Sequence, residues 1–334
     1  PLAAARRDLL GSWCGAGDAT RAESILETLR RRNGTNGILH APGCDVAGAS
    51  RAGFPAAVAA AEQADAVVLV LGESWDMSGE ARSRTRLDLP GVQADLLRAV
   101  QAVGKPTVVV LLAGRPLALA EELPFADAWL LAWFPGTEGG RAVADALFGV
   151  VEPGGRLPVT FPRHAGQVPI FYNHKNTGRP FDPANPRADY RSTYFDCAND
   201  PLFPFGYGLG YTRMAYSPVT LSADRLIPGG TLTASVTVTN TGERPGAEVV
   251  QLYLRQRPAS VTRPVRELRN FRKIQLAPGE AQTVTFPLTA DDLRFLRADM
   301  TWGTEPGGIE VFVGPDAGPL VRIFMRGVSA GELV

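Results

Sequence analysis

The chain has 334 residues, of which 45% are hydrophobic and 20% charged, and its 34 basic and 34 acidic side chains give a formal net charge of zero. At roughly 100–200 residues per domain this length allows two domains, and the hydrophobic content lets each of them bury a core. Zero net charge argues against a protein that binds nucleic acid or an anionic membrane, and no apolar stretch reaches the roughly 18 residues that a membrane span needs.

The first part of the chain alternates between helical and strand-like patterns. Residues 66–72 (AVVLVLG) form a continuous apolar run that is too short for a helix and is typical of a strand buried on both faces. Further strands are expected at 107–113 and 128–134, and helices at 51–64, 90–103 and 138–148. This alternation predicts an open, mostly parallel α/β sheet with helices on both faces, an α/β sandwich that we assign to residues 1–165.

A connecting segment is expected at residues 166–215. It is dense in proline, glycine, asparagine and aromatic residues and shows no sustained period. Long stretches without regular structure are uncommon in compact domains and are usually functional segments or linkers. The aromatic side chains argue against a flexible linker, so we expect the segment to pack across another surface.

The last part of the chain, residues 216–334, has the patterns of β-strands. Residues 232–239 (LTASVTVT) alternate strictly, and residues 240–242 (NTG) follow as a turn. Further strands are expected at 247–255, 282–288 and 308–313. Short strands separated by Gly, Pro and Asn predict an all-β sandwich of the immunoglobulin or fibronectin type III-like kind.

Cysteine usage gives no sign of a disulfide framework or a metal centre. Cys14, Cys44 and Cys197 are too few for the first and are not spaced like zinc ligands. We expect three unpaired thiols, with a single disulfide as the alternative. The sequence points to no metal ion and to no cofactor.

The most unusual local stretch is the loop at residues 72–84, which directly follows a predicted strand. In open α/β sheets, ligands bind on loops beyond the carboxyl ends of the strands. Carboxylates beside a tryptophan suit sugars, which need acid chemistry and a flat apolar platform, and this loop holds Glu73, Asp76, Glu80 and Trp75. From spacing alone, a solvated loop in which Glu80 pairs with Arg82 or Arg84 is the stronger interpretation.

Two other kinds of site are poorly supported. Neither a GxGxxG after a strand nor a GxxxxGK[ST] occurs, and the glycine-rich residues 136–140 place Glu138 where a phosphate would sit, which favours a tight turn. A Ser-His-Asp hydrolase is disfavoured because no GxSxG is present. Of the three histidines, His174 lies in the aromatic-rich segment and is kept as a candidate for substrate contact.

Short motifs are spread along essentially the whole chain. They are RDLLGSW at 7–13, SGEARSR at 78–84, GKP at 104–106, LAGRPL at 112–117, GGRLPVTFP at 154–162, NTGRP at 176–180, PFGYGL at 204–209, VTNTG at 238–242 and VVQLY at 249–253. In combination they resemble the C-terminal part of a family 3 glycoside hydrolase of the bacterial periplasmic β-glucosidase type.

The resemblance implies a catalytic site shared between domains. In that family a TIM-like barrel comes first and carries an aspartate nucleophile. The α/β sandwich follows and carries the glutamate that acts as general acid/base, and a fibronectin type III-like domain often comes last. The residue here that matches the glutamate is Glu80. A retaining pair of carboxyl groups stands about 5–5.5 Å apart, a distance that a loop reaching over a barrel mouth can set. The residues expected to bind substrate around it are Trp75, Asp76, Met77, Ser78 and His174.

Nearby arginines bear on this role. A general acid must carry a proton at the start of the reaction, which requires a pKa raised by burial or by the neighbouring nucleophile. Arg82 and Arg84 would oppose this if they paired with Glu80. We therefore expect both arginine side chains to point away from the catalytic centre.

The chain also departs from the family's pattern, because it has no barrel and no aspartate that matches the nucleophile motif. The resemblance places Pro1 and Leu2 just after the first strand of the sandwich. The first strand of a doubly wound sheet is commonly central, so without it we expect unpaired backbone and exposed apolar surface in mid-sheet. Either a neighbouring segment or chain supplies the missing part, or the chain is a fragment of a longer gene product. We favour the fragment and expect it to be inactive alone.

The leading hypothesis is the C-terminal portion of a retaining β-glycosidase, a β-glucosidase that hydrolyses terminal β-linked glucose from oligosaccharides. The expected partners are a β-linked oligosaccharide or glucoside as substrate and an N-terminal TIM-like barrel domain. Neither nucleic acid nor a membrane is expected, and a homo-oligomer stays open. By resemblance alone, the location is periplasmic or secreted. The alternatives are a non-catalytic carbohydrate-binding or interaction module and a structural sandwich whose apolar face mediates oligomer formation.

Overall fold

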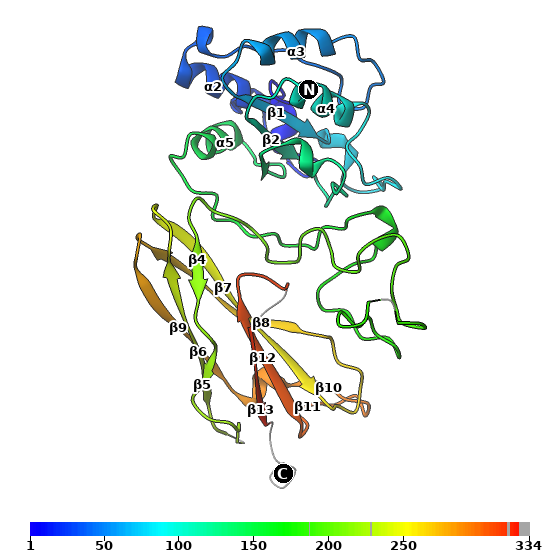
Figure 1. The fold of residues 1–334 in the computed structure, drawn as a ribbon, viewed down its shortest axis with the longest axis vertical. Helices are drawn as coiled ribbons and strands as arrows, with labels where there is room; N and C mark the ends of the chain where they lie inside the picture. The colour runs from blue at the N-terminus through cyan, green and yellow to red at the C-terminus, as the bar shows by residue number, and fades with distance from the viewer. Residues whose placement is uncertain (187, 228, 319–320, 327–334) are drawn as a thin grey trace. The chain divides into compact units, whose positions relative to one another are not determined.

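The protein consists of two compact units (Figure 1). The computed structural model describes residues 1–186, 188–227, 229–318 and 321–326. The first unit comprises Pro1–Val151 and Pro162–Val168, and the second comprises Glu152–Phe161 and Pro169–Val334. None of the helices that the structure describes is long and apolar enough to cross a membrane.

The first unit is built on a parallel three-stranded sheet. Its strands are β1 (Val67–Gly72), β2 (Thr107–Leu112) and β3 (Ala128–Leu131), in the order β1-β2-β3. Its helices are α1 (Arg6–Leu10), α2 (Ile25–Asn33), α3 (Phe54–Glu62), α4 (Gln93–Gln101) and α5 (Gly139–Leu147). Gly72 pairs with Leu112, and Leu111 pairs with Leu131, so the carboxyl ends of the three strands meet at one edge of the sheet.

Helices cover both faces of this sheet. On one face, Val70, Val110 and Leu112 share a buried cluster with side chains from α1, α2 and α5. Leu71 and Leu111, which point to the opposite face, are buried as well, and there α4 lies against β1 and α3 against α4. Strands buried on both faces explain the continuous apolar run in the sequence. The predicted open α/β sheet is confirmed.

The observed helices differ from the expected ones in extent and number. The helix expected at 90–103 begins only at Gln93, because the preceding residues form a turn in which the Pro90 carbonyl accepts a bond from the Gln93 amide at 3.4 Å. The sequence analysis did not anticipate α1 and α2. For α2 a local signal was present, since Ser24 and Glu27 stand at the spacing of a capping box.

That capping box stabilises the amino terminus of α2. The Ser24 hydroxyl accepts a bond from the Glu27 amide at 3.2 Å, and the Glu27 carboxylate accepts one from the Ser24 amide at 2.8 Å. Arg6 of α1 donates to the same carboxylate, with 2.9 Å between Arg6 Nε and Glu27 Oε2. The bond from Arg6, followed by that from the Ser24 amide, lowers the pKa of Glu27 from 4.5 to about 2.

We expect Glu27→Gln to lower the free energy of unfolding by less than about 1 kcal/mol near neutral pH, because glutamine can still accept the bond from the Ser24 amide but loses the ion pair with Arg6, whose partners are both exposed. A carboxyl group whose pKa is lower in the folded state stabilises the fold fully above its unfolded value of 4.5, and this contribution is lost as the pH falls through about 2. The difference between the two proteins should therefore shrink over that range. Urea denaturation at several pH values measures it, with Glu62→Gln as a control at an exposed position of α3. A difference that does not change with pH would contradict the role of the Glu27 charge.

An open groove runs beside β1, at the edge of the sheet. Among the strands that the structure describes, β1 pairs only with β2, and the Leu2 amide donates to the Val70 carbonyl at 3.2 Å. The groove has a volume of about 770 Å³ and is lined by apolar side chains that include Leu29 and Val68. Val68 is 37% exposed although it lies within an apolar strand. The free strand edge and the exposed apolar surface thus lie on the β1 side of the sheet, and the described strands follow one another without a gap in mid-sheet.

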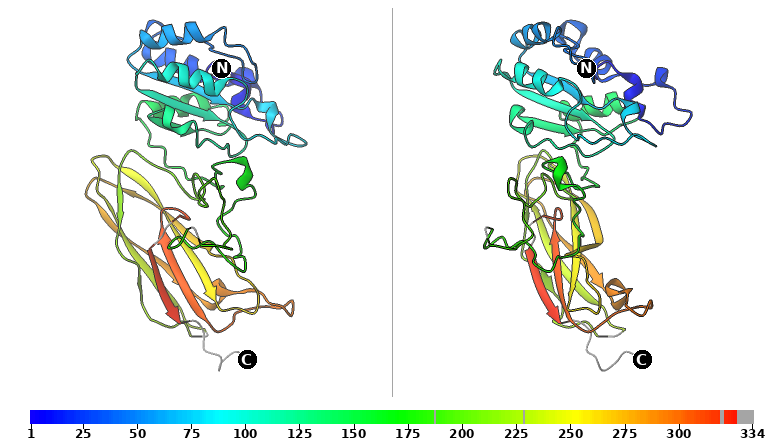
Figure 2. Two further views of the ribbon diagram at one scale, coloured as in Figure 1. Left: turned by 45° about the vertical axis from the view of Figure 1, so that its right-hand side comes forward. Right: turned by 90° about the vertical axis from the view of Figure 1, so that its right-hand side faces the viewer.

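The second unit is a β-sandwich of two stacked sheets (Figure 2). Its strands are β4 (Met214–Tyr216), β5 (Thr220–Leu221), β6 (Leu232–Asn240), β7 (Gly246–Arg257), β8 (Glu267–Leu276), β9 (Ala281–Leu288), β10 (Phe295–Leu296), β11 (Trp302–Gly303), β12 (Gly308–Gly314) and β13 (Val321–Arg326). One sheet has the order β13-β12-β7-β8, and the other has β4-β6-β5 with β9 paired to β6. β10 and β11 pair separately with each other. Alternate side chains of β6 face the core, as the pattern predicted. The fibronectin type III-like sandwich is confirmed.

Aromatic residues of the connecting segment pack within the second unit. Tyr172 stacks on Phe205 with ring centroids 4.5 Å apart and meets Tyr253 of β7 edge-on at 5.7 Å. The Tyr253 hydroxyl donates to Gln251 Oε1 at 2.6 Å, and Gln251 Nε2 donates to the Gly206 carbonyl at 3.2 Å. The PFGYGL motif at 204–209 and the VVQLY motif at 249–253 are thus two sides of one contact.

Candidate active site

A loop at residues 73–88 leaves β1 at the carboxyl edge of the sheet. Gly72, the last residue of β1, has a φ of +126°, and a Cβ there would lie 1.8 Å from the Leu112 carbonyl oxygen of β2. Only glycine can take this path, because a side chain would collide with the backbone of the neighbouring strand. The loops that follow β2 and β3 leave at the same edge, where ligands bind in open α/β sheets.

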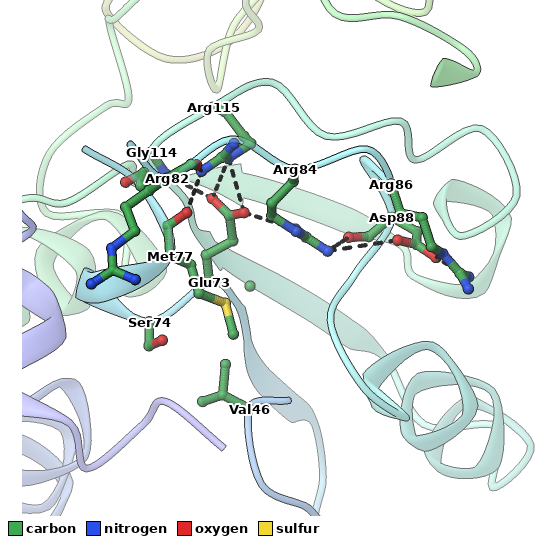
Figure 3. A network of polar contacts seen from close by, with 12 residues as sticks. Val46, Glu73, Ser74, Met77, Arg82, Arg84, Arg86, Asp88, Gly114 and Arg115 are labelled. Carbon is green, nitrogen blue, oxygen red and sulfur yellow. Dashed lines mark hydrogen bonds and ion pairs between the residues drawn. The ribbon is translucent and has the colours of Figure 1, made fainter. Parts of the chain in front are cut away.

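A buried carboxylate anchors the base of this loop (Figure 3). Glu73 is fully buried, and its Oε1 lies 2.7 Å from Nη1 of Arg84 and 3.0 Å from Nε of Arg115. Its Oε2 accepts a bond from the Gly114 amide at 3.3 Å. Such partners are required, because an uncompensated charge in a protein interior costs several kcal/mol. Glu73 thus joins the start of the loop to its later part and to the residues just after β2.

Arg115 also holds both limbs of the loop. Its Nη2 donates to the carbonyl oxygens of Met77 and Arg82, the latter at 2.8 Å. Met77 precedes the tip of the loop, and Arg82 follows it. One guanidinium group therefore binds the buried carboxylate and closes the loop around residues 78–81 (Figure 3).

The amino-terminal residues of the unit hold the first limb. The Asp8 carboxylate accepts a bond from the Trp75 amide at 2.7 Å, and the Ser12 hydroxyl lies 2.5 Å from the carbonyl oxygens of both Trp75 and Ser78. Burial raises the pKa of the Asp8 carboxyl group, and the bond from the Trp75 amide opposes this rise. The short 3-10 helix at Trp75–Met77 is fixed by these contacts on the side facing α1.

Glu80 lies at the exposed tip of the loop. The Gly79 carbonyl accepts a bond from the Arg82 amide at 3.3 Å, and Ala81 has a φ of +57°. Residues 79–82 therefore form a tight turn with Glu80 at its first central position. The turn presents the Glu80 side chain at a corner of the backbone.

The charged side chains near Glu80 in the sequence do not pair with its carboxylate. Within the described ranges, no hydrogen bond or ion pair involves its side chain. Arg84 pairs with Glu73 instead, and Figure 3 shows the Arg82 side chain extending away from Glu73. The alternative in which Glu80 pairs with one of these arginines is thus not observed. An exposed carboxyl group of this kind can give its proton to a bound molecule, and the carboxylate that results can take a proton back.

The other loop residues expected to bind substrate share this loop with Glu80; they are Trp75, Asp76, Met77 and Ser78. The Arg7 guanidinium lies 4.0 Å from the centroid of the Trp75 ring and covers one of its faces. Asp76 is exposed. Ser78 packs closely on Gly114, where a Cβ would come within 2.0 Å of the Ser78 hydroxyl oxygen. Trp75 and Asp76 are thus accessible in part, whereas Ser78 fixes the loop to the residues after β2.

Trp13 is a site candidate that was not selected from the sequence. Its side chain is 75% exposed, and a Cβ on Gly79 would lie 3.7 Å from Trp13 Nε1. The indole therefore stands beside the residue that precedes Glu80. The only sequence signal was the position of Trp13 at the end of the RDLLGSW motif, and its proximity to the loop is a property of the tertiary structure.

The remaining candidate residue, His174, belongs to the second unit. It is exposed; its Nδ1 is 3.1 Å from the Lys175 carbonyl oxygen, and its own carbonyl accepts a bond from the Val265 amide at 2.9 Å. The three cysteines are free thiols, namely Cys14, Cys44 and Cys197. In the part of the chain that the structure describes, no group of three or more His, Cys, Asp or Glu side chains is arranged to hold a metal ion.

Two family models match the chain. Residues 2–211 match the glycosyl hydrolase family 3 C-terminal domain, and residues 248–317 match the fibronectin type III-like domain. The first match contains the loop with Glu80 and most of the connecting segment. The second lies within the β-sandwich.

Individual relatives agree with these models. The chain is 47% identical to the periplasmic beta-glucosidase of Salmonella typhimurium over 95% of its own length and 44% of that protein. It is 43% identical to a beta-xylosidase of Formosa agariphila over 87% of its length and 39% of that protein. The crystal structure of a beta-glucosidase from Listeria innocua in complex with isofagomine superposes with a TM-score of 0.92 and 37% identity, covering 98% of this chain and 45% of that one. The chain thus spans less than half the length of each of these proteins.

Proposed function

The chain belongs to glycosyl hydrolase family 3, and on this premise we propose that it is the acid/base part of a retaining β-glycosidase. Glu80 is the general acid/base, and an aspartate on a separate N-terminal barrel domain is the nucleophile. One observation supports this assignment above all. Glu80 is an exposed carboxylate without a partner among the described residues, at the tip of a loop whose two limbs are both held by Arg115.

In this proposal Glu80 transfers a proton twice. First, its carboxyl group gives a proton to the glycosidic oxygen while the barrel aspartate attacks the anomeric carbon, so that the C–O bond breaks and the alcohol leaves. Then the Glu80 carboxylate takes a proton from water, and the water oxygen attacks the anomeric carbon and displaces the aspartate. One water is consumed, and the anomeric configuration is retained.

The proposed substrate is a terminal β-linked glucose. The relatives from Salmonella typhimurium and Listeria innocua are named beta-glucosidases, whereas that from Formosa agariphila is named a beta-xylosidase. The two sugars differ in the hydroxymethyl group of glucose, which xylose lacks. The name of the Salmonella typhimurium relative also supports a periplasmic location, which we propose here as well.

The test is to compare the chain alone with a chimera that carries the N-terminal part of the Salmonella typhimurium relative ahead of Pro1. We expect the 334-residue chain alone to leave 4-nitrophenyl β-glucoside intact, because one carboxylate cannot replace the covalent step. The chimera should hydrolyse it and retain the configuration, which NMR of the first-formed sugar shows. The β-xyloside is the comparison substrate.

Two results would contradict this proposal. Turnover by the chain alone would show that it contains its own nucleophile. An inactive but folded chimera, together with calorimetric binding of laminaribiose to the chain that survives Glu80→Gln, would instead favour a non-catalytic carbohydrate-binding module. If the chimera hydrolyses the xyloside faster than the glucoside, the proposed mechanism stands and the proposed substrate is a β-xyloside instead.

Trp13 is expected to form a platform for the leaving-group sugar. Its indole is exposed beside Gly79. Pairs of aromatic rings contribute about 0.5–1.5 kcal/mol, and we take the same range for a sugar ring stacked on the indole. In the chimera, Trp13→Ala should raise KM for laminaribiose by up to about tenfold. It should leave KM for methyl β-glucoside, which has no second sugar, nearly unchanged. Trp302→Ala, at a 63% exposed position of the second unit, is the control; equal effects of the two variants would argue against a platform.

A further inference from the structure

We infer that Arg115 is a positioning residue for Glu80, a role that rests on the proposed function. The two residues do not need to touch for this. Arg115 binds the carbonyl oxygens of Met77 and Arg82 and thereby sets the distance between the two limbs that carry the turn with Glu80.

One guanidinium group binds both limbs of the loop and the buried carboxylate at its base. Its Nε is 3.0 Å from the Glu73 carboxylate, which is fully buried, and the same side chain is only 17% exposed. Its Nη2 lies between the two carbonyl oxygens. The rigid fork of an arginine can satisfy a carboxylate and backbone carbonyls together, whereas the single ammonium point of a lysine cannot. The buried carboxylate therefore holds the guanidinium, and the guanidinium holds the loop.

The fixed points stop just short of Glu80. On the first limb, the Ser12 hydroxyl reaches the Ser78 carbonyl at 2.5 Å. On the second limb, Arg115 reaches the Arg82 carbonyl at 2.8 Å. Between them, the turn has a single backbone bond, from the Arg82 amide to the Gly79 carbonyl at 3.3 Å. Without Arg115, the first limb would keep its bond from Ser12, whereas the Arg82 carbonyl would lose its partner and only the turn bond would tie Arg82 to the first limb.

A displaced acid affects some substrates more than others. A misplacement of about 1 Å can cost about 100-fold in rate, but a good leaving group such as 2,4-dinitrophenolate departs without protonation. A general loss of folding or domain assembly would lower the rates for both kinds of substrate alike. The ratio of kcat/KM for phenyl and 2,4-dinitrophenyl β-glucosides thus separates positioning from structure.

Arg84 offers a matched control. It binds the same buried carboxylate, at 2.7 Å, but its other bond goes to the Asp88 carbonyl at 3.2 Å and not to the carbonyls that flank the turn. Arg115→Lys and Arg84→Lys therefore make the same chemical change at Glu73. Only the first removes the contacts with Met77 and Arg82.

The experiment compares Arg115→Lys, Arg84→Lys and Glu80→Ala in the chimera described above. We expect Arg115→Lys to lower kcat/KM for the phenyl glucoside by about 100-fold and that for the dinitrophenyl glucoside by less than about threefold. Arg84→Lys should leave the ratio of the two unchanged. In the 334-residue chain, Arg115→Lys should also speed amide hydrogen exchange at residues 78–82, whereas Arg84→Lys should not.

The outcomes distinguish the positioning role from the proposed function. If Glu80→Ala changes the ratio and Arg115→Lys does not, the positioning role is overturned and the proposed function stands. If Glu80→Ala does not change it either, the proposed function fails. An equal change with Arg84→Lys would assign the effect to Glu73 and not to the loop carbonyls. Should Arg115→Lys fail to fold, a triple variant with Glu73→Leu, Arg84→Met and Arg115→Met removes the same contacts without leaving a buried charge, and its ratio should fall as well.

Discussion

Replacement of Glu80 by alanine should lower kcat of the chimera for phenyl β-glucoside by about 10²–10⁴-fold, the range that general acid–base catalysis contributes. With 2,4-dinitrophenyl β-glucoside, kcat/KM should change little, because the first step then needs no acid. The second step still lacks its base, so the glycosyl-enzyme accumulates and kcat falls. Azide needs no deprotonation, and it should therefore raise kcat and give β-glucosyl azide as the product.

The control for this substitution is Glu62→Ala, which removes an exposed carboxylate of the same unit from α3. It should leave kcat and kcat/KM for both glucosides unchanged, and azide should then have no effect on kcat beyond that seen with the unaltered chimera. A Glu80→Ala chimera with unaltered phenyl glucoside turnover would assign the proton transfer to another residue. Loss of activity on both glucosides without any glycosyl azide would point to a damaged fold. The unfolding temperature of the variant measures this separately.

Most of the fold could be predicted from local patterns in the sequence. The strands β1, β2 and β6 were predictable because their apolar residues follow the pattern of their burial. β1 and β2 are continuously apolar and have both faces covered, whereas β6 alternates and has one face in the core. β8 was missed because it lies on the edge of its sheet and, of its ten residues, only Ile274 and Leu276 are buried. An edge strand with one end in the core does not alternate along its length.

The candidate site divides in the same way. Glu80 could be selected because it follows a buried strand at the edge where α/β sheets bind ligands, and because its motif resembles that of a known family. Arg115 could not, because two of its partners are backbone carbonyls, which carry no sequence signal, and its third, Glu73, is 42 residues away. Glu73 itself looked like one of several loop carboxylates, and only its complete burial separates it from Asp76 and Glu80.

The burial of Glu73 makes it the residue whose loss should most destabilise the first unit. Glu73→Gln keeps the size of the side chain but leaves Arg115 without its counter-charge and Arg84 with only the Asp88 carboxylate, 3.7 Å away. Breaking a buried pair in this way costs about 3–5 kcal/mol. The two arginines are 20% and 17% exposed, so partial hydration places the expected loss near about 3 kcal/mol. Urea denaturation followed by tryptophan fluorescence measures it, since all the tryptophans except Trp302 lie in the first unit.

The matched control for Glu73→Gln is Glu23→Gln, which breaks the ion pair with Arg31 at 2.9 Å. These partners are 37% and 61% exposed, and a pair of that kind contributes less than about 1 kcal/mol. Equal losses in the two variants would mean that burial does not set the energy of the Glu73 network. The apolar triple variant at positions 73, 84 and 115 completes the argument: stability should return, because no unpaired charge remains, while the Met77 and Arg82 carbonyls stay without their guanidinium. Recovered stability with a persistently low phenyl-to-dinitrophenyl ratio would show that the network maintains the fold through its charges and positions Glu80 through its hydrogen bonds.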